Sequence, residues 1–77
     1  MYQRGYRTVR KWHGKKIIID LANVPFPLGN GPEVMVMYAS NGAEIESARP
    51  ADLNEAVVVY RQMLGKYPED AKEAGRR

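Results

Sequence analysis

The 77-residue chain contains no cysteine and only one histidine. A disulfide and a cysteine-ligated zinc site are therefore excluded, and one imidazole is too few for an ordinary transition-metal site. Domains shorter than about 80 residues often need a disulfide, a metal ion or a partner subunit for support. We expect no cofactor. With a disulfide and a metal site excluded, a partner subunit remains as the support, and we expect a homodimer. The alternative is that the single core of the chain is sufficient by itself.

Long apolar runs are also missing, since the longest, Ile17–Ile19 and Val57–Val59, have three residues each. A membrane-spanning helix needs about 18 or more, and no apolar stretch follows the basic N-terminus as it would in a secretory signal. We therefore expect a cytoplasmic protein without membrane contact. The 44% apolar and 27% charged residues are ordinary for a globular domain, and no linker divides residues 1–77.

Acidic residues are absent from residues 1–16, although the chain as a whole carries a net charge of only +3. The sequence therefore predicts a basic N-terminal segment on an acidic body. Its cations are Arg4, Arg7, Arg10, Lys11, Lys15 and Lys16.

Residues 5–22 show the pattern of a β-hairpin that follows a loose N-terminal arm, residues 1–4. Tyr6 to Trp12 alternate in polarity, His13-Gly14 suits a two-residue turn, and residues 15–22 are rich in β-branched side chains. This turn predicts the cross-strand pairs Trp12–Lys15, Lys11–Lys16, Val9–Ile18 and Arg7–Asp20, the last as an ion pair.

Residues 23–32 contain three prolines and two glycines and are predicted to form a loop, with Phe26 and Leu28 folded back over an edge of the core. Residues 33–40 form the next predicted strand. Both of its faces are apolar, which indicates a central strand covered by the helix on one side and by a partner subunit or the proline loop on the other. Asn41-Gly42 then predicts a turn into a short strand, residues 43–48.

A helix is predicted over residues 53–64, within a segment spanning 52–65. Asp52 and Glu55 have the spacing of a capping box, Gly65 suits a C-cap, and residues 68–77 form a polar tail. The expected apolar stripe consists of Leu53, Ala56, Val57, Tyr60 and Leu64. The predicted fold is α+β: a three- to four-stranded antiparallel meander, residues 5–48, with one C-terminal helix packed on one face.

Two surfaces are candidates for binding. The basic hairpin, whose cations alternate with Tyr2, Tyr6 and Trp12, could contact nucleic acid or an acidic protein, and the alternative is a solvated hairpin with its aromatic residues in the core. Val58, Val59 and Met63 lie off the helical stripe and are a candidate subunit contact or else scattered surface residues. Met35 and Met37 could form an adaptable binding face, but at strand spacing they favour a core role.

No catalytic apparatus is predicted. His13 lies in a predicted turn without a partner to orient it, and Ser40 and Ser47 lack an activating context. Glu44 and Glu46 are expected to point outward from a solvent-exposed edge strand, whereas Ile45 is expected to point inward. The segment Gly29–Pro32 lacks the features of a phosphate-binding loop.

The second half of the chain resembles small phage and mobile-element proteins of unknown function. The likeness lies in the strand Glu33–Met37, the strand Glu44–Glu46, Arg49 and the helix opening Asp52–Ala56. The order of elements also resembles the partial double-stranded-RNA-binding-like fold of HicB-type antitoxins. These resemblances imply a fold and no activity. We therefore expect a non-catalytic, homodimeric interaction module, with nucleic-acid binding through the basic hairpin as the alternative.

Overall fold

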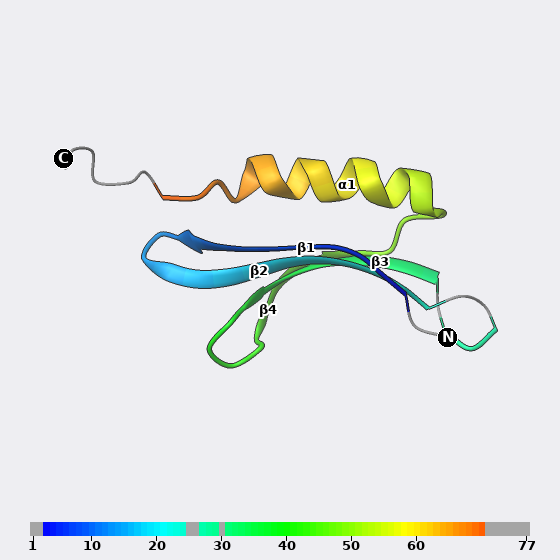
Figure 1. Cartoon of the computed structure of the whole chain (residues 1–77), viewed down its shortest axis with the longest axis horizontal. Coiled ribbons are helices and arrows are strands. Elements are labelled where there is room, and N and C mark those ends of the chain that lie inside the picture. The colour runs from blue at the N-terminus through cyan, green and yellow to red at the C-terminus, as the bar shows by residue number, and fades with distance from the viewer. Residues whose placement is uncertain (1–2, 25–26, 30, 71–77) are drawn as a thin grey trace.

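The computed structural model describes residues 3–24, 27–29 and 31–70. Within them, one antiparallel sheet with the order β1-β2-β3-β4 is followed by a helix (Figure 1). The elements are β1 (Gln3–Trp12), β2 (Lys15–Val24), β3 (Gly31–Tyr38), β4 (Glu44–Ala48) and α1 (Leu53–Lys66). The predicted α+β meander with a C-terminal helix is confirmed.

The first hairpin has the predicted register, including the Arg7–Asp20 and Lys11–Lys16 pairs. Its turn is tight because His13 and Gly14 both adopt positive φ, 50° and 80°.

Residues 3 and 4 of the predicted loose arm belong to β1, which begins at Gln3, and residues 1 and 2 lie outside the described residues. A bulge at Gly5 lets the strand continue. A Cβ at this position would lie 2.8 Å from Leu21 Cδ2, so a larger residue here would require the Leu21 side chain to shift.

The proline-rich loop is shorter than predicted. Asn23 pairs with Pro32 and Val24 with Gly31, which extends both strands into the expected loop. Leu28 is 78% exposed, so the prediction that it covers the core is wrong. Phe26 lies outside the described residues.

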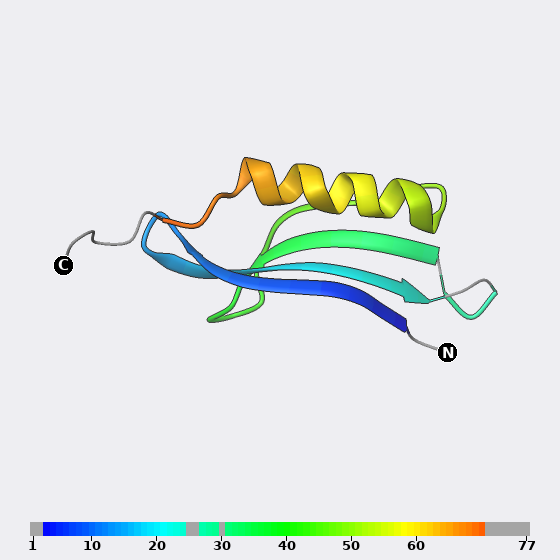
Figure 2. The ribbon, with the colours of Figure 1, turned by 45° about the horizontal axis from the view of Figure 1, so that its top comes forward.

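The core lies between the sheet and α1, which runs along the strands and contacts β2 and β3 (Figure 2). Five aliphatic side chains from the sheet are fully buried there: Ile17, Ile19, Leu21, Val34 and Val36. The helix and the residue after it contribute Ala56, Tyr60, Met63 and Tyr67.

The predicted helical stripe is confirmed at Ala56 and Tyr60, which are buried, and at Val57 and Leu64, which pack partly buried against the core; it differs at Met63 and Leu53. Residues 56, 60, 63 and 67 form one line at helical spacing, so Met63 faces the sheet and Leu53 remains 47% exposed. Sequence periodicity alone did not distinguish this line from its neighbour, because apolar residues occupy both.

The helix begins as predicted and ends later. The Asp52 carboxylate accepts a hydrogen bond from the Glu55 amide at 2.8 Å, and the Glu55 side chain accepts one from the Ala51 amide at 3.1 Å. The predicted Gly65 C-cap is wrong, because the helix continues through Lys66 and Tyr67 is the cap. The Tyr67 amide completes the last turn by donating to the Met63 carbonyl at 2.9 Å.

Candidate interaction surfaces

Strand alternation divides the predicted basic surface between the two faces of the sheet. Arg10 points toward α1, and Lys15 lies on the same face, with its Nζ 5.5 Å from the centre of the Tyr38 ring. Arg7, Lys11 and Lys16 belong to the opposite face. Arg4 lies in β1, and its side chain is outside the described structure. The cations therefore do not form one continuous surface.

Arg10 was predicted as a free cation and is instead part of the fold. Its Nη1 donates to the carbonyl oxygens of Leu64 and Tyr67, at 3.1 Å each. These carbonyls end the helix, where a positive charge is favourable and hydrogen-bond donors are needed. Arg10 is therefore engaged in holding the helix end against β1.

Arg7 forms the predicted ion pair. Its Nε lies 3.2 Å from the Asp20 carboxylate, which is 8% exposed. The exposed cations of the described hairpin are therefore Lys11, Lys15, Lys16 and the ion-paired Arg7, whose side chain is 40% exposed. The prediction of nucleic-acid contact stays untested; of its six cations, Arg10 is engaged at the helix end, Arg7 is in an ion pair and the Arg4 side chain lies outside the described structure.

The polar tail returns to the hairpin tip, which we define as residues Lys11–Lys16. The two Asp70 carboxylate oxygens accept hydrogen bonds from the His13 and Gly14 amides at 2.7 and 2.8 Å, and the Asp70 amide donates to the Lys11 carbonyl at 2.7 Å. Hydrogen bonds from Gly14 and His13 lower the pKa of Asp70. The basic ribbon is thus partly neutralised by the protein's own tail, contrary to the prediction that it stands free in water.

A cluster of aromatic and charged side chains packs around the end of the helix, next to the hairpin tip. The Tyr67 ring meets Trp12 edge-on at 4.9 Å between ring centres, and its hydroxyl donates to Glu46 at 2.6 Å. Lys66 lies 2.8 Å from the same carboxylate. The hydrogen bonds from Lys66 and then Tyr67 lower the pKa of Glu46, and the hydrogen bond to Glu46 raises the pKa of Tyr67 to about 12.

The prediction that Glu46 points outward is therefore wrong. Val36 pairs with Glu46, and Met37 pairs with Glu44, so Ile45 is an extra residue in a bulge. This irregularity turns Glu46 toward the helix side of the sheet, where Val36 also lies. Sequence alternation does not show where such a bulge falls.

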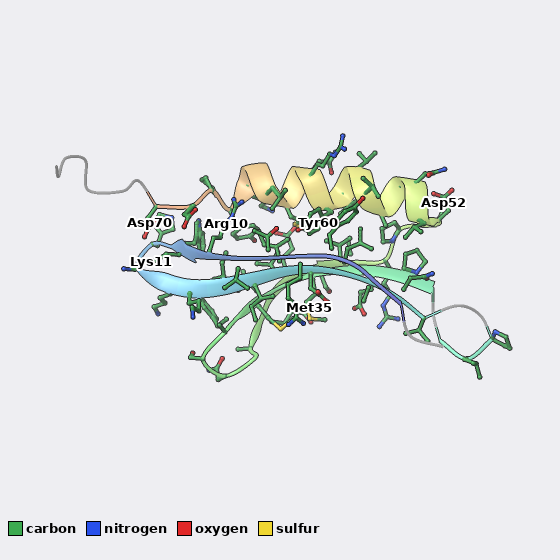
Figure 3. All side chains as sticks on the ribbon, in the orientation of Figure 1. Arg10, Lys11, Met35, Asp52, Tyr60 and Asp70 are labelled. Atoms are coloured by element: carbon green, nitrogen blue, oxygen red, sulfur yellow. The ribbon has the colours of Figure 1, made fainter. Side chains whose placement is uncertain are left out.

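The sheet face opposite the helix, here called the open face, carries an apolar row. Val9, Ile18 and Met37 are direct neighbours across three strands, and Met35 lies in the next row. Val9 is 50% exposed and the other three are half-buried. Met35 points away from α1 (Figure 3). This row lies on the face of the sheet that α1 does not cover.

The helical residues predicted as a subunit contact are in three different environments. Val58 is 54% exposed, Val59 is half-buried against the core, and Met63 is only 5% exposed. Met63 cannot contact a partner without unfolding, so Val58 is the exposed member of the predicted set.

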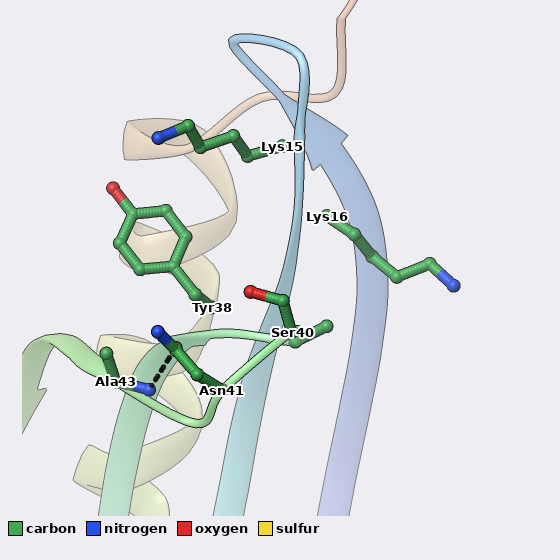
Figure 4. Close-up of a pocket in the computed structure, with 7 residues that line it drawn as sticks. Lys15, Lys16, Tyr38, Ser40, Asn41 and Ala43 are labelled. Atoms are coloured by element: carbon green, nitrogen blue, oxygen red, sulfur yellow. Dashed lines mark hydrogen bonds between the residues drawn. The ribbon is translucent and has the colours of Figure 1, made fainter.

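A shallow notch lies between the start of β2 and the β3–β4 turn (Figure 4). Tyr38, Ser40 and Asn41 line it, and the Asn41 side chain is occupied by a hydrogen bond from the Ala43 amide at 2.9 Å. Lys15 and Lys16 also border the notch but extend to opposite sides of β2. Converging acid–base or nucleophilic groups are not found there.

Metal-binding chemistry has no candidate in the described part of the chain, where no group of three or more His, Asp or Glu residues is placed to hold an ion. Among the same residues, no helix has the length and apolarity to cross a membrane. No protein-family model, curated protein or solved structure matches this chain.

Proposed function

We propose that this protein is a non-catalytic interaction module that pairs with a second copy of itself through the open face of the sheet. The observation that carries this proposal is the uncovered row formed by Val9, Ile18 and Met37, with Met35 beside it. A solvated face of an antiparallel sheet normally carries polar residues at these positions. A contiguous apolar surface is typical of an interaction site.

The size of the molecule favours the sheet face over the helix. A typical stable interface takes about 800 Å² from each partner, roughly a sixth of the 5188 Å² accessible surface of this chain. The exposed Val58 side chain supplies only a small part of this area. A whole face of the sheet is needed, and methionine side chains adapt readily to an opposing apolar surface.

The charges on the open face favour a second copy as the partner. Lys11 and Lys16 lie at one end of the strands, and Glu33, which is 3.8 Å from Arg49 in an ion pair, lies on the same face at the other end. A twofold axis across the strands, between the rows of Met35 and Met37, brings Lys16 of each copy near the row of Glu33 in the other copy. The same axis places Met37 of one copy over Met35 of the other, and it sets Val9 and Ile18 of one copy against the Arg7–Asp20 row of the other.

The first test is the mass in solution. Sedimentation equilibrium at micromolar concentration should give twice the 8.7 kDa chain mass. Met37→Lys places a charge at the β3 end of the apolar row and should weaken the dimer at least roughly 30-fold. The matched control is Val58→Lys on the helix surface, which should leave the mass unchanged.

The result can refute the proposal in two ways. A monomeric wild type would remove the dimer altogether. A dimer that survives Met37→Lys but dissociates with Val58→Lys would place the interface on the helix. Far-ultraviolet circular dichroism of each variant separates loss of pairing from loss of fold.

A charge exchange tests the twofold arrangement. Lys16→Glu and Glu33→Lys should each weaken the dimer, because each places like charges opposite one another. The double variant should restore pairing at low salt. If the double variant does not regain pairing at low salt, this twofold orientation is refuted, and the two copies of a dimer must be oriented differently.

A further inference from the structure

The hairpin tip offers a complete set of hydrogen-bonding partners for one amino-acid residue. The His13 and Gly14 amides donate to the two carboxylate oxygens of Asp70 at 2.7 and 2.8 Å. The Lys11 carbonyl accepts from the Asp70 amide at 2.7 Å. Asp70, Lys11 and Arg10 lie together at this end of the molecule in Figure 3. Three hydrogen bonds therefore engage a single aspartate.

The turn conformation creates the donor pair. His13 and Gly14 both have positive φ, and consecutive amides in such a turn can bind one anion together. Because β2 pairs with the other side of β1, the outward-facing Lys11 carbonyl remains available to a third strand. Asp70 uses both features, and its amide pairs with β1 as the amide of an added strand would.

This arrangement distinguishes aspartate from related anions. The carboxylate of a glutamate is one methylene farther from its own amide, so it cannot match the turn and the Lys11 carbonyl at the same spacing. A phosphate ion can accept from the two turn amides, but it has no peptide N–H to donate to Lys11. The site therefore fits an aspartate within a peptide chain.

The surrounding charges favour an acidic ligand. Lys11 and Lys16 are direct cross-strand neighbours at the tip, and two like charges in this position are unfavourable without an anion nearby. Hydrogen bonds from Gly14 and His13, together with the charge of Lys11, lower the pKa of Asp70. The ionised carboxylate is thus the form that the site holds.

We infer that the hairpin tip is a recognition site for an aspartate in an extended acidic peptide, and that Asp70 fills this site within the same chain. The Asp70 hydrogen bonds to the turn are exposed at the surface. Tyr67 is buried, so only the short segment after it has to move for another peptide to enter. A peptide in trans therefore competes with the tail, whose effective concentration is high because its linker is short.

The experiment compares the wild type with Asp70→Ala, using an acetylated and amidated Pro-Glu-Asp-Ala peptide, the sequence of residues 68–71. Titrations followed by ¹H–¹⁵N nuclear magnetic resonance should move the His13 and Gly14 amide signals of Asp70→Ala. The wild type should bind the peptide at least roughly tenfold more weakly, since its own tail occupies the site. Glu69→Ala is the matched control and should behave as the wild type.

Peptides with asparagine or glutamate in place of the aspartate test the recognition chemistry, as does inorganic phosphate. Each should move the same two signals much less than the aspartate peptide does. The inference is wrong if the aspartate peptide leaves the His13 and Gly14 signals of Asp70→Ala unchanged, or if glutamate or phosphate acts as strongly. Measurements in the Met37→Lys background keep this outcome separate from dimerisation.

Discussion

The two faces of the sheet carry similar aliphatic side chains in different environments. Ile17 and Ile19 are fully buried under α1, whereas Ile18 between them is half-exposed on the open face. The two faces also differ in the contacts that the polar residues of β1 make. Thr8 forms a hydrogen bond with the Tyr60 hydroxyl, and Arg10 binds the end of the helix. The helix thus covers the face on which β1 provides partners for its polar groups as well as apolar contacts.

The largest expected effect is the difference in stability between alanine substitutions on the two faces of the sheet. Ile19→Ala should lower the free energy of unfolding by about 2–5 kcal/mol, because it leaves a cavity under the helix. Ile18→Ala removes the same atoms from the open face and should cost less than about 1 kcal/mol. Urea unfolding in the Met37→Lys background measures both in the monomer. Equal losses would mean that the open face is packed in the monomer as well.

A smaller effect should follow from Arg10→Met, which keeps much of the side-chain volume and removes the donors to Leu64 and Tyr67. Leaving these carbonyls without Arg10 should cost about 1–3 kcal/mol. Lys11→Met, the adjacent position on the open face, is the matched control for loss of charge. Thermal or urea unfolding should show the larger loss for Arg10→Met, and the reverse order would contradict the role given to Arg10.

The smallest effect is a pH dependence that belongs to the helix-covered side. The pKa of Glu46 is lowered in the folded chain by Lys66 and Tyr67, so its ionised form stabilises the fold above the unfolded-state pKa. That contribution is lost as the pH falls through the lowered value. Urea midpoints measured from about pH 6 to about pH 3 should therefore decline less steeply in Glu46→Gln than in the wild type. Identical slopes would exclude a contribution from Glu46.

Local signals predicted much of the fold. His13-Gly14 determined the register of the first hairpin, because a two-residue turn specifies every pair that follows it until the bulge at Gly5. Asp52 and Glu55 placed the start of the helix through contacts within one turn. Both predictions depend on residues close together in the sequence, where side-chain chemistry and backbone geometry are directly linked.

The predictions that failed concern residues whose partners are distant in the sequence. The prediction that the helix ends at Gly65 is wrong. Arg10, more than 50 residues earlier in the sequence, binds the carbonyl oxygens at the observed end of the helix. Met63 is buried and Leu53 is exposed, the reverse of the prediction, because only one of two possible apolar lines on the helix packs against the sheet. A bulge that alternation could not locate redirected Glu46.

The candidate sites divide in the same way. The basic residues could be identified from the sequence, and so could a strand with two apolar faces, predicted over residues 33–40 and observed as Gly31–Tyr38. A partner on its second face stays a prediction. The occupation of the hairpin tip by Asp70 could not be identified, because the charge pattern alone does not show which carboxylate reaches which amide.

By itself, the sequence determined the elements, their order, the first hairpin's register and the start of the helix, since each follows from propensities and turns acting over a few residues. Tertiary structure alone decided which cations are engaged, where the helix ends and which sheet face stays open. These outcomes depend on hydrogen bonds and packing between segments that meet only when the chain is folded.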